Sequence, residues 1–289
     1  MHNLANLQLR GDFDGIRALK GSVAACAFVF LAGVASAAEL PGTFSPPIWS
    51  PPILAPRPFG WTGCYVGGHL GGAWNDGTVF TDQGNGLFSA YSGGTHSWTA
   101  DSKSSFIGGG TFGCNFQPIG SVVLGIEGEA GFMKLEGSAI DNTFRTTDVL
   151  GSAKIGDWYA MITPRLGYAW DRALLYVKAG VAFVPVQASI VDSCLSIAAG
   201  CNNALVSTAG SHTITTYTVG GGLEWAFADR WSVKGEYMFI GLGNNRTLTT
   251  CGPASTAAGT VPGGDFCFGH EFRSIQTFKI GLNYLFGSL

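Results

Sequence analysis

The stretch Ser274–Phe286, which reads Ser-Ile-Gln-Thr-Phe-Lys-Ile-Gly-Leu-Asn-Tyr-Leu-Phe, decides the fold. In an extended strand its large apolar side chains share one face; they are Phe278, Ile280, Leu282, Tyr284 and Phe286. The other face carries Thr277, Lys279, Gly281 and Asn283. At about 3.3 Å per residue and a tilt of about 40°, the stretch rises about 33 Å, close to the thickness of a bilayer's hydrocarbon core. This pattern predicts a membrane-spanning strand that closes a β-barrel.

The composition of the chain fits a membrane barrel made of alternating strands. The 289 residues are 46% hydrophobic and 12% charged, yet outside the N-terminus no apolar run reaches the roughly eighteen residues of a spanning helix. In lipid every backbone N–H and C=O needs a partner, and a sheet meets that need only by closing on itself. The net charge of −3 argues against a nucleic-acid partner.

Seven further stretches alternate in the same way, so eight strands are predicted in all. They are Thr62–Trp74, Ser104–Phe116, Val122–Phe132, Trp158–Trp170, Ala173–Val186, Thr213–Phe227, Trp231–Gly241 and Ser274–Phe286. Three connections are short turns (117–121, 171–172 and 228–230), and the other four run to about 25 residues or more. This alternation predicts an all-β, eight-stranded antiparallel up-and-down transmembrane β-barrel with short periplasmic turns and four long extracellular loops.

The N-terminal part of the chain has the features of an export signal. Within residues 1–37 a basic segment is followed by the apolar stretch Ser22–Val34 and by the small-residue site Ala35-Ser36-Ala37, so we expect a cleaved signal peptide. Residues 38–60 contain seven prolines and predict an extended periplasmic linker. Residues 61–289 are then the barrel, and we expect the mature protein in a bacterial outer membrane.

The two faces of the predicted strands differ in chemistry. The charged side chains within the strands all lie in the phase opposite the large apolar ones; they are Glu127, Glu129, Arg165, Lys178, Glu224, Lys234, Glu236 and Lys279. A soluble β-sandwich would show the same alternation. Five tryptophans at strand ends favour the membrane barrel, because they suit an interfacial aromatic girdle; they are Trp74, Trp158, Trp170, Trp225 and Trp231. We therefore expect the charges to pair inside a narrow lumen and largely to plug it.

The opening of the predicted barrel resembles a known family. Trp61–Trp74 reads Trp-Thr-Gly-Cys-Tyr-Val-Gly-Gly-His-Leu-Gly-Gly-Ala-Trp and follows a signal peptide and a proline-rich stretch. Together with the closing Gly281-Leu282-Asn283-Tyr284-Leu285-Phe286, it is similar to the small outer-membrane immunogenic proteins, the porin family or OmpA-like β-barrel proteins of Gram-negative bacteria. The resemblance implies an eight-stranded barrel, a structural role or limited diffusion, and antigenic surface loops.

Six cysteines remain after signal cleavage, in a compartment that oxidises thiols. We expect three disulfides: Cys64–Cys114 between neighbouring strands, and Cys194–Cys201 and Cys251–Cys267, each within one long loop. The alternative for Cys64 and Cys114 is that both are free apolar side chains. We expect no metal site, since no Cys-x-x-Cys or His-x-x-x-His spacing occurs, and no cofactor.

Three functions remain open from the sequence. The first is a structural barrel whose loops present an antigenic or adhesive surface, and the second is a small pore, which requires the interior ion pairs to open. The third is a lipid-modifying enzyme, for which only His96, His212 and His270, together with Asp and Ser residues of the loops, are candidates near the outer rim. We favour the first and expect no catalytic residue. The expected partners are outer-membrane lipid, the barrel-assembly machinery during biogenesis, and host or phage surface ligands, for a chain that we expect to be a monomer.

Overall fold

The structure is a computed structural model that describes residues 59–83, 96–141, 149–194, 204–243, 247–256 and 259–286. None of these residues forms a helix that is long and apolar enough to cross a membrane. The strands are β1 (Gly63–Asn75), β2 (Thr78–Asp82), β3 (His96–Ala100), β4 (Ser105–Ile119), β5 (Val122–Ile140), β6 (Val149–Gly156), β7 (Tyr159–Trp170), β8 (Ala173–Cys194), β9 (Ala204–Ala228), β10 (Trp231–Ile240), β11 (Thr247–Thr256), β12 (Gly259–Phe272) and β13 (Ile275–Phe286). The predicted signal peptide and nearly all of the predicted linker lie outside the described residues.

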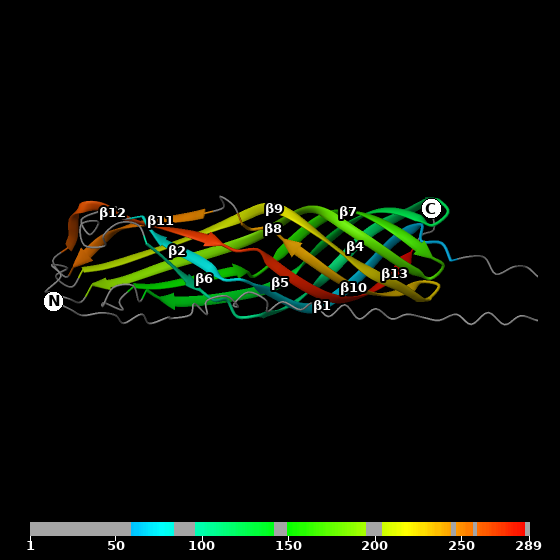
Figure 1. Cartoon of the computed structure of the whole chain (residues 1–289), viewed down its shortest axis with the longest axis horizontal. Helices are drawn as coiled ribbons and strands as arrows, with labels where there is room; N and C mark the ends of the chain where they lie inside the picture. Colours follow the sequence, from blue (N-terminus) through cyan, green and yellow to red (C-terminus); the bar gives the residue numbers. More distant parts are fainter. Residues whose placement is uncertain are drawn as a thin grey trace, which may run out of the picture. The chain divides into compact units, whose positions relative to one another are not determined.

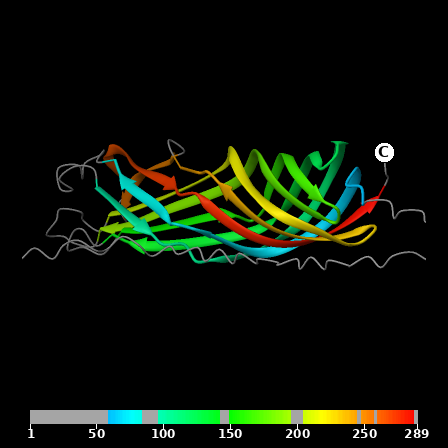
Figure 2. The same cartoon turned by 45° about the vertical axis from the view of Figure 1, so that its right-hand side comes forward.

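Eight of these strands form a ring of antiparallel pairs in the order β1-β4-β5-β7-β8-β9-β10-β13 (Figures 1 and 2). The ring closes between β1 and β13, where Cys64 lies opposite Phe286 and Asn75 lies opposite Ile275. Each strand of the ring overlaps one of the stretches predicted from the sequence. The predicted antiparallel, up-and-down barrel is therefore confirmed.

Short turns connect the ring strands at one end of the barrel, which we call the turn end; the opposite end is the loop end. In the β4–β5 turn Gly120 has a φ of 54°, and in the β7–β8 turn Asp171 has a φ of 50°. Glycine adopts this left-handed region without a steric cost, and Asp tolerates it because its short polar side chain can bond locally. These tight turns hold the two strands of each hairpin in register, so that their apolar phases face the same way.

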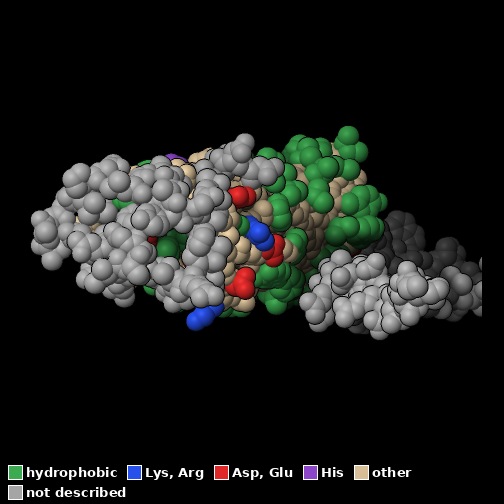
Figure 3. Space-filling view, turned by 60° about the vertical axis from the view of Figure 1, so that its left-hand side comes forward, with side chains coloured by type: hydrophobic (Ala, Val, Ile, Leu, Met, Phe, Trp, Pro, Cys, Tyr) green, Lys and Arg blue, Asp and Glu red, His purple; other side chains and the backbone are tan. Residues whose placement is uncertain are grey.

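The outer face of the ring is apolar. On β13, Phe278, Ile280, Leu282 and Phe286 are exposed on the outside, and Tyr284 is half-buried against the ring of Trp231, with a centroid distance of 5.0 Å. Exposed large side chains of the other ring strands continue this surface, part of which Figure 3 shows in green on the visible side of the barrel. We call it the apolar band. A face of this kind is stable only when lipid covers it.

The strands continue beyond the apolar band at the loop end. β5, β8 and β9 are long enough to do so themselves, while β2, β3, β6, β11 and β12 extend the other ring strands, in the order β3-β2-β12-β11-β9-β8-β6-β5. We call this part the extension. The long connections, which the sequence suggested as loops, are therefore partly β-structure.

The extension was missed because the apolar phase changes sides where it begins. On β8, Val177 and Val181 face outward within the apolar band, whereas Val184, Val186 and Ile190 are fully buried farther along the same strand. When a strand is expected to keep its apolar side chains on one face along its whole length, this inversion looks like the end of the strand. The extension therefore has an apolar interior, like a soluble β-protein, although it continues a membrane barrel.

An irregularity between β6 and β7 marks the edge of the apolar band. Residues 156–159 lie opposite residues 184–185 of β8, so the ladder shifts register there. Asp157 has a φ of 90°, and Pro185 has no N–H to donate, as is typical of a β-bulge. The bulge bends the strand at the point where Trp158 is exposed on the outer face.

Candidate functional site

The barrel interior contains all eight charged side chains that the sequence placed in the non-apolar phase. None of them is more than 4% exposed. They are Glu127 and Glu129 on β5, Arg165 on β7, Lys178 on β8, Glu224 on β9, Lys234 and Glu236 on β10, and Lys279 on β13. We call these residues the interior charge cluster. They point inward because the period of two that turns their apolar neighbours to lipid turns them to the lumen.

Glu127 on β5 joins opposite walls of the barrel. Its Oε1 accepts a hydrogen bond from Lys178 Nζ at 2.7 Å, and its Oε2 accepts one from Lys234 Nζ at 3.0 Å. The Tyr65 hydroxyl donates to the same Oε2 at 2.5 Å. Since β5 and β10 are half a ring apart, the contact between Glu127 and Lys234 spans the interior from wall to wall.

Lys279 on the closing strand also bridges two carboxylates. Its Nζ lies 3.1 Å from Glu236 Oε1 and contacts Glu129 Oε1. The other oxygen of Glu236 lies 2.7 Å from Lys178 Nζ, so Lys178 pairs with acids on β5 and on β10 at once. Tyr159 donates to Glu129 at 2.8 Å, and this hydroxyl also lies 2.5 Å from His69 Nε2.

Arg165 forms a second group of contacts nearer the turn end. One guanidinium nitrogen donates to Glu224 Oε2 at 2.8 Å, and another donates to the Tyr65 hydroxyl at 2.8 Å. The guanidinium also lies over the ring of Tyr176, 4.1 Å from its centroid, which is a favourable cation–π geometry. The free oxygen of Glu224 accepts hydrogen bonds from Ser232 and Asn283.

Three carboxylates of the cluster have the spacing of a metal site. One oxygen each of Glu127, Glu129 and Glu236 lies within 4.8 Å of the others. The ammonium groups of Lys178 and Lys279 already contact these oxygens. With four acidic and four basic members the cluster carries no excess negative charge that would favour a divalent cation. The arrangement suits internal ion pairing.

The sequence did not single out the tyrosines that complete the cluster. Tyr65, Tyr159 and Tyr176 are buried, and each donates to or contacts a cluster charge. Their position in the strand could have revealed them, because Tyr176 stands two residues before Lys178 and therefore shares its inward phase. A buried tyrosine needs a partner for its hydroxyl, and the carboxylates provide one.

At the turn end an apolar layer covers the charge cluster. Trp61 is buried there, with Nε1 donating to the carbonyl of Asp171 at 3.0 Å and its backbone N–H donating to Gln117 Oε1 at 3.0 Å. Phe59 packs edge-on against Trp61 and lies under the guanidinium of Arg172. Because the β7–β8 turn lies nearly opposite β1 in the ring, the segment Phe59–Trp61 crosses the mouth of the barrel.

At the loop end a second apolar layer begins directly above the charges and continues into the extension. Its side chains are buried and pack on one another; they include Ile107, Met133, Met161, Ala182, Ile240 and Ile275. The charge cluster thus lies between two layers of buried apolar side chains.

The five predicted girdle tryptophans are exposed on the outer face. Trp74 and Trp158 stand at the loop end, whereas Trp170, Trp225 and Trp231 stand at the turn end. Two of the three predicted cysteine pairs are disulfides: Cys64–Cys114 links β1 to β4, and Cys251–Cys267 links β11 to β12. Cys201 and the side chain of Cys194 lie outside the described part of the chain.

Known proteins resemble this chain over most of its length. The family model of the outer membrane protein beta-barrel domain matches residues 55–286. The 31 kDa outer-membrane immunogenic protein of Brucella melitensis biotype 1 is 27% identical over 246 residues, which cover 82% of this chain and 89% of that protein. The protein of the same name from Brucella suis biovar 1 matches with the same figures.

Among solved structures, OprG from Pseudomonas aeruginosa has a TM-score of 0.45 at 11% identity and covers 78% of this chain and 96% of its own. Ail from Yersinia pestis has a TM-score of 0.34 at 11% identity and covers 78% and 99%. The family model matches well over half of the chain, and this protein belongs to the outer membrane protein beta-barrel domain family.

Proposed function

We propose that this protein is a closed outer-membrane barrel that holds a β-structured surface outside the cell, for contact with host cells, phages or neighbouring bacteria. Membership of the family places the barrel in the outer membrane, with the apolar band in lipid. In the orientation that we propose, the turn end faces the periplasm and the extension lies outside the cell.

The contact between Glu127 and Lys234 carries the proposal of a closed lumen. It joins opposite walls within a cluster that excludes water, and Lys178 and Lys279 fill the space beside it. Ion passage would require these pairs to separate in a medium of low dielectric, where leaving one buried charge unpaired costs about 3–5 kcal/mol. The Trp61 layer below and the apolar layer above add further closures in series.

The extension supports the proposed surface role. Next to the apolar band many of its outward side chains are polar, as at Ser138, Ser152, Ser189 and Ser211, so this part of the face suits water rather than lipid. Ile140, Leu150 and Val191 are exposed farther along the same strands. The Brucella relatives are named as immunogenic outer-membrane proteins, which fits a part of the molecule that antibodies reach. The strands β8 and β9 run without interruption from the barrel into the extension, so this surface is held rigidly.

Conductance across a planar bilayer tests the closed lumen. The mature chain is refolded in detergent, and heat-modifiable migration on a gel confirms that the barrel has formed. We expect no discrete current steps from the wild type. A matched variant, Glu127→Ala with Lys234→Ala, keeps the net charge and shortens both side chains of the cross-lumen pair, so we expect it to leak. Reproducible steps from the wild type would overturn the proposal.

A small pore is the second candidate, because one lysine of the cluster has an alternative partner. Oε2 of Glu129 has no hydrogen bond among the described residues, and Lys178 Nζ lies 3.9 Å from it while bonded to Glu127. In this second proposal, a shift of Lys178 from Glu127 to Glu129 is the first step of opening. Steps that appear only at high applied voltage would favour this pore over the permanently closed barrel.

Labelling of intact cells tests the proposed surface exposure. The side chain of Lys134 on the extension is 55% exposed, whereas the side chains of Lys234 and Lys279 are buried in the barrel. A membrane-impermeant amine reagent should modify Lys134 on whole cells and leave the interior lysines unmodified. Labelling of Lys134 only after the outer membrane is broken would contradict the proposed orientation.

An enzymatic role is not part of the proposal. His212 is exposed on β9, while His270 is buried beside Thr250 and Phe80, so these two candidates have separate surroundings. Nothing in the family match points to catalysis. Hydrolysis or acyl transfer on outer-membrane lipid by the refolded protein would contradict the proposal.

A further inference from the structure

The β11–β12 hairpin of the extension is attached unevenly to its two neighbours. On one side β12 pairs with β2 through a continuous ladder from Phe268 to Phe272. On the other side the described part of β11 pairs with β9 at two residues, Ala254 and Ser255. Closer to the membrane, the contact between β11 and β9 is made by side chains instead of by the ladder.

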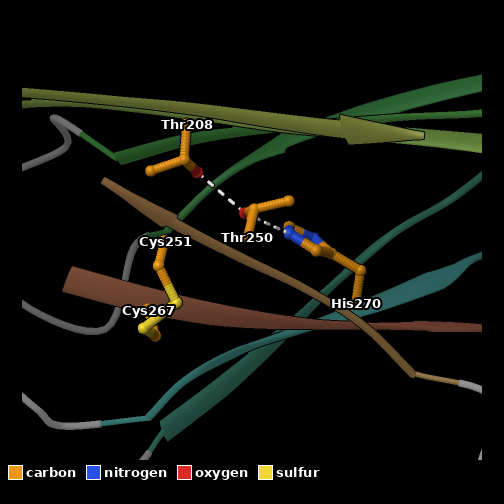
Figure 4. Close-up of a disulfide and its surroundings, with 5 residues drawn as sticks. All are labelled: Thr208, Thr250, Cys251, Cys267 and His270. Atoms are coloured by element: carbon orange, nitrogen blue, oxygen red, sulfur yellow. Dashed lines mark hydrogen bonds between the residues drawn. A yellow bond between two sulfur atoms is a disulfide. The ribbon is translucent and has the colours of Figure 1, made fainter. Parts of the chain in front are cut away.

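That contact is a chain of hydrogen bonds across three strands (Figure 4). Thr208 on β9 and Thr250 on β11 are joined through their hydroxyls at 2.7 Å. The Thr250 hydroxyl in turn lies 2.8 Å from Nε2 of His270 on β12. Thr208 and Thr250 are 4% exposed and His270 is fully buried, so water does not compete for these bonds.

His270 is placed as a neutral imidazole. The rings of His270 and Phe80 are in T-shaped contact, with their centroids 5.4 Å apart. Among the described residues, Nδ1 of His270 has no hydrogen-bond partner. A protonated imidazole needs acceptors for two N–H groups and a favourable surrounding for its charge. Here the described residues offer the ring one hydroxyl oxygen, that of Thr250 at Nε2, and no acceptor at Nδ1.

No nearby charge compensates for the burial of His270. The titratable groups on the strands around it in the extension are Asp82 on β2, Asp265 and Glu271 on β12, His212 on β9 and Asp192 on β8; β11 has none. Asp265, Glu271 and His212 are exposed. Burial alone lowers the pKa of His270 to about 4, without an opposing contribution from a carboxylate.

The Cys251–Cys267 disulfide secures the hairpin itself. It joins directly opposite residues of β11 and β12. Because side chains alternate along a strand, Cys251 lies on the face opposite Thr250. The hairpin can therefore separate from β9 without coming apart.

We propose that the Thr208–Thr250–His270 chain is an acid-sensitive latch, which holds the β11–β12 hairpin against β9 at neutral pH and releases it when the surroundings become acidic. In the released hairpin His270 is hydrated and takes up a proton near pH 6.5. In the latched hairpin it takes one up only near pH 4. The latch is therefore at full strength above about pH 6.5, and the released population rises up to roughly tenfold for each unit of pH between about 6.5 and 4.

Amide hydrogen exchange of the full chain in lipid nanodiscs tests the latch. After correction for intrinsic exchange rates, protection of Thr247–Thr256 should fall roughly fivefold between pH 6.5 and 5.5, and roughly sevenfold further by pH 4.5, while protection of the ring strands stays constant. In His270→Phe the pH dependence should disappear. In the control His212→Phe, which alters an exposed histidine on β9, it should remain.

Two further measurements test the latch even if His270→Phe does not fold. The first is the NMR titration of the His270 ring in the wild type, in which a midpoint near 6.5 would overturn the latch. The second is Thr250→Val, which removes the central hydroxyl at nearly constant shape. It should raise exchange of Thr247–Thr256 several-fold at pH 7, and unchanged protection would also overturn the latch. A pH-independent wild type, or His270→Phe with wild-type pH dependence, would refute it outright.

Discussion

Removing one member of the Glu127–Lys234 pair should destabilise the barrel more than removing both. Among the described residues Lys234 forms its ion pair with Glu127, at 3.0 Å, and both side chains are at most 2% exposed. Lys234→Met therefore leaves one uncompensated negative charge in the interior, and Glu127→Gln leaves one uncompensated positive charge. Each should cost about 3–5 kcal/mol. The double variant restores neutrality, so we expect its cost to fall short of the sum by about 2 kcal/mol or more.

Urea unfolding in lipid vesicles, followed by tryptophan fluorescence, measures these costs as a double-mutant cycle. The matched control is the pair Lys134–Glu136, which is equally close at 2.8 Å but has side chains 55% and 52% exposed. Removing either member of this exposed pair should cost less than about 1 kcal/mol. If Glu127→Gln costs no more than Glu136→Gln, or if the costs of the Glu127 and Lys234 variants are additive, the reasoning about a dry, coupled interior is refuted.

Three other changes test the remaining parts of the barrel. Trp61→Ala should lower the free energy of unfolding by about 3–5 kcal/mol, since it empties a buried site at the periplasmic mouth, and urea titration would show whether the loss is instead negligible. Replacing Cys64 and Cys114 together by Ser should lower the free energy of unfolding by about 4 kcal/mol, and the same change at Cys251 and Cys267 should lower it by about 3 kcal/mol. The difference is expected because the first disulfide joins residues 50 apart in the chain and the second joins residues 16 apart. Equal losses in denaturant titration would contradict this entropic account. Leu166→Arg, on the outer face of β7, should lower the free energy of unfolding by about 2–4 kcal/mol, whereas Ser211→Arg, above the apolar band, should change it by no more than about 0.5 kcal/mol. Refolding yields and urea midpoints that rank the two variants the other way would contradict the assignment of the apolar band to lipid.

The barrel was predictable from the sequence because lipid imposes a strict rule on each spanning strand. Every large side chain of β13 that the period of two assigned to one face lies on the outer face of the ring, and Lys279 points inward as the same rule requires. The phase of a charged residue within its strand was therefore sufficient to assign it to the interior. The partners of each charge were not predictable, because pairing across the lumen depends on ring order and stagger, as in the contact between Glu127 and Lys234.

The extension and the latch lie beyond what the pattern could predict. Val184, Val186 and Ile190 turn inward on the same strand whose Val177 turns outward, and nothing in a window of the sequence indicates where lipid ends. His270 looked like one of three scattered loop histidines, since its burial depends on β11, the other strand of its hairpin, and on β2, which is distant in the chain. Long-range packing, rather than local preference, decides both features.

The continuity of the extension with the barrel affects how the protein should be used as an immunogen. On one outward row Ser138, Ser152 and Ser189 lie side by side although they come from three different strands. A linear peptide from any one of these strands would contain one serine of this row and lack the other two. Antibodies that recognise this surface must therefore bind a conformational epitope. A preparation used to raise such antibodies would have to keep the barrel folded in lipid or detergent.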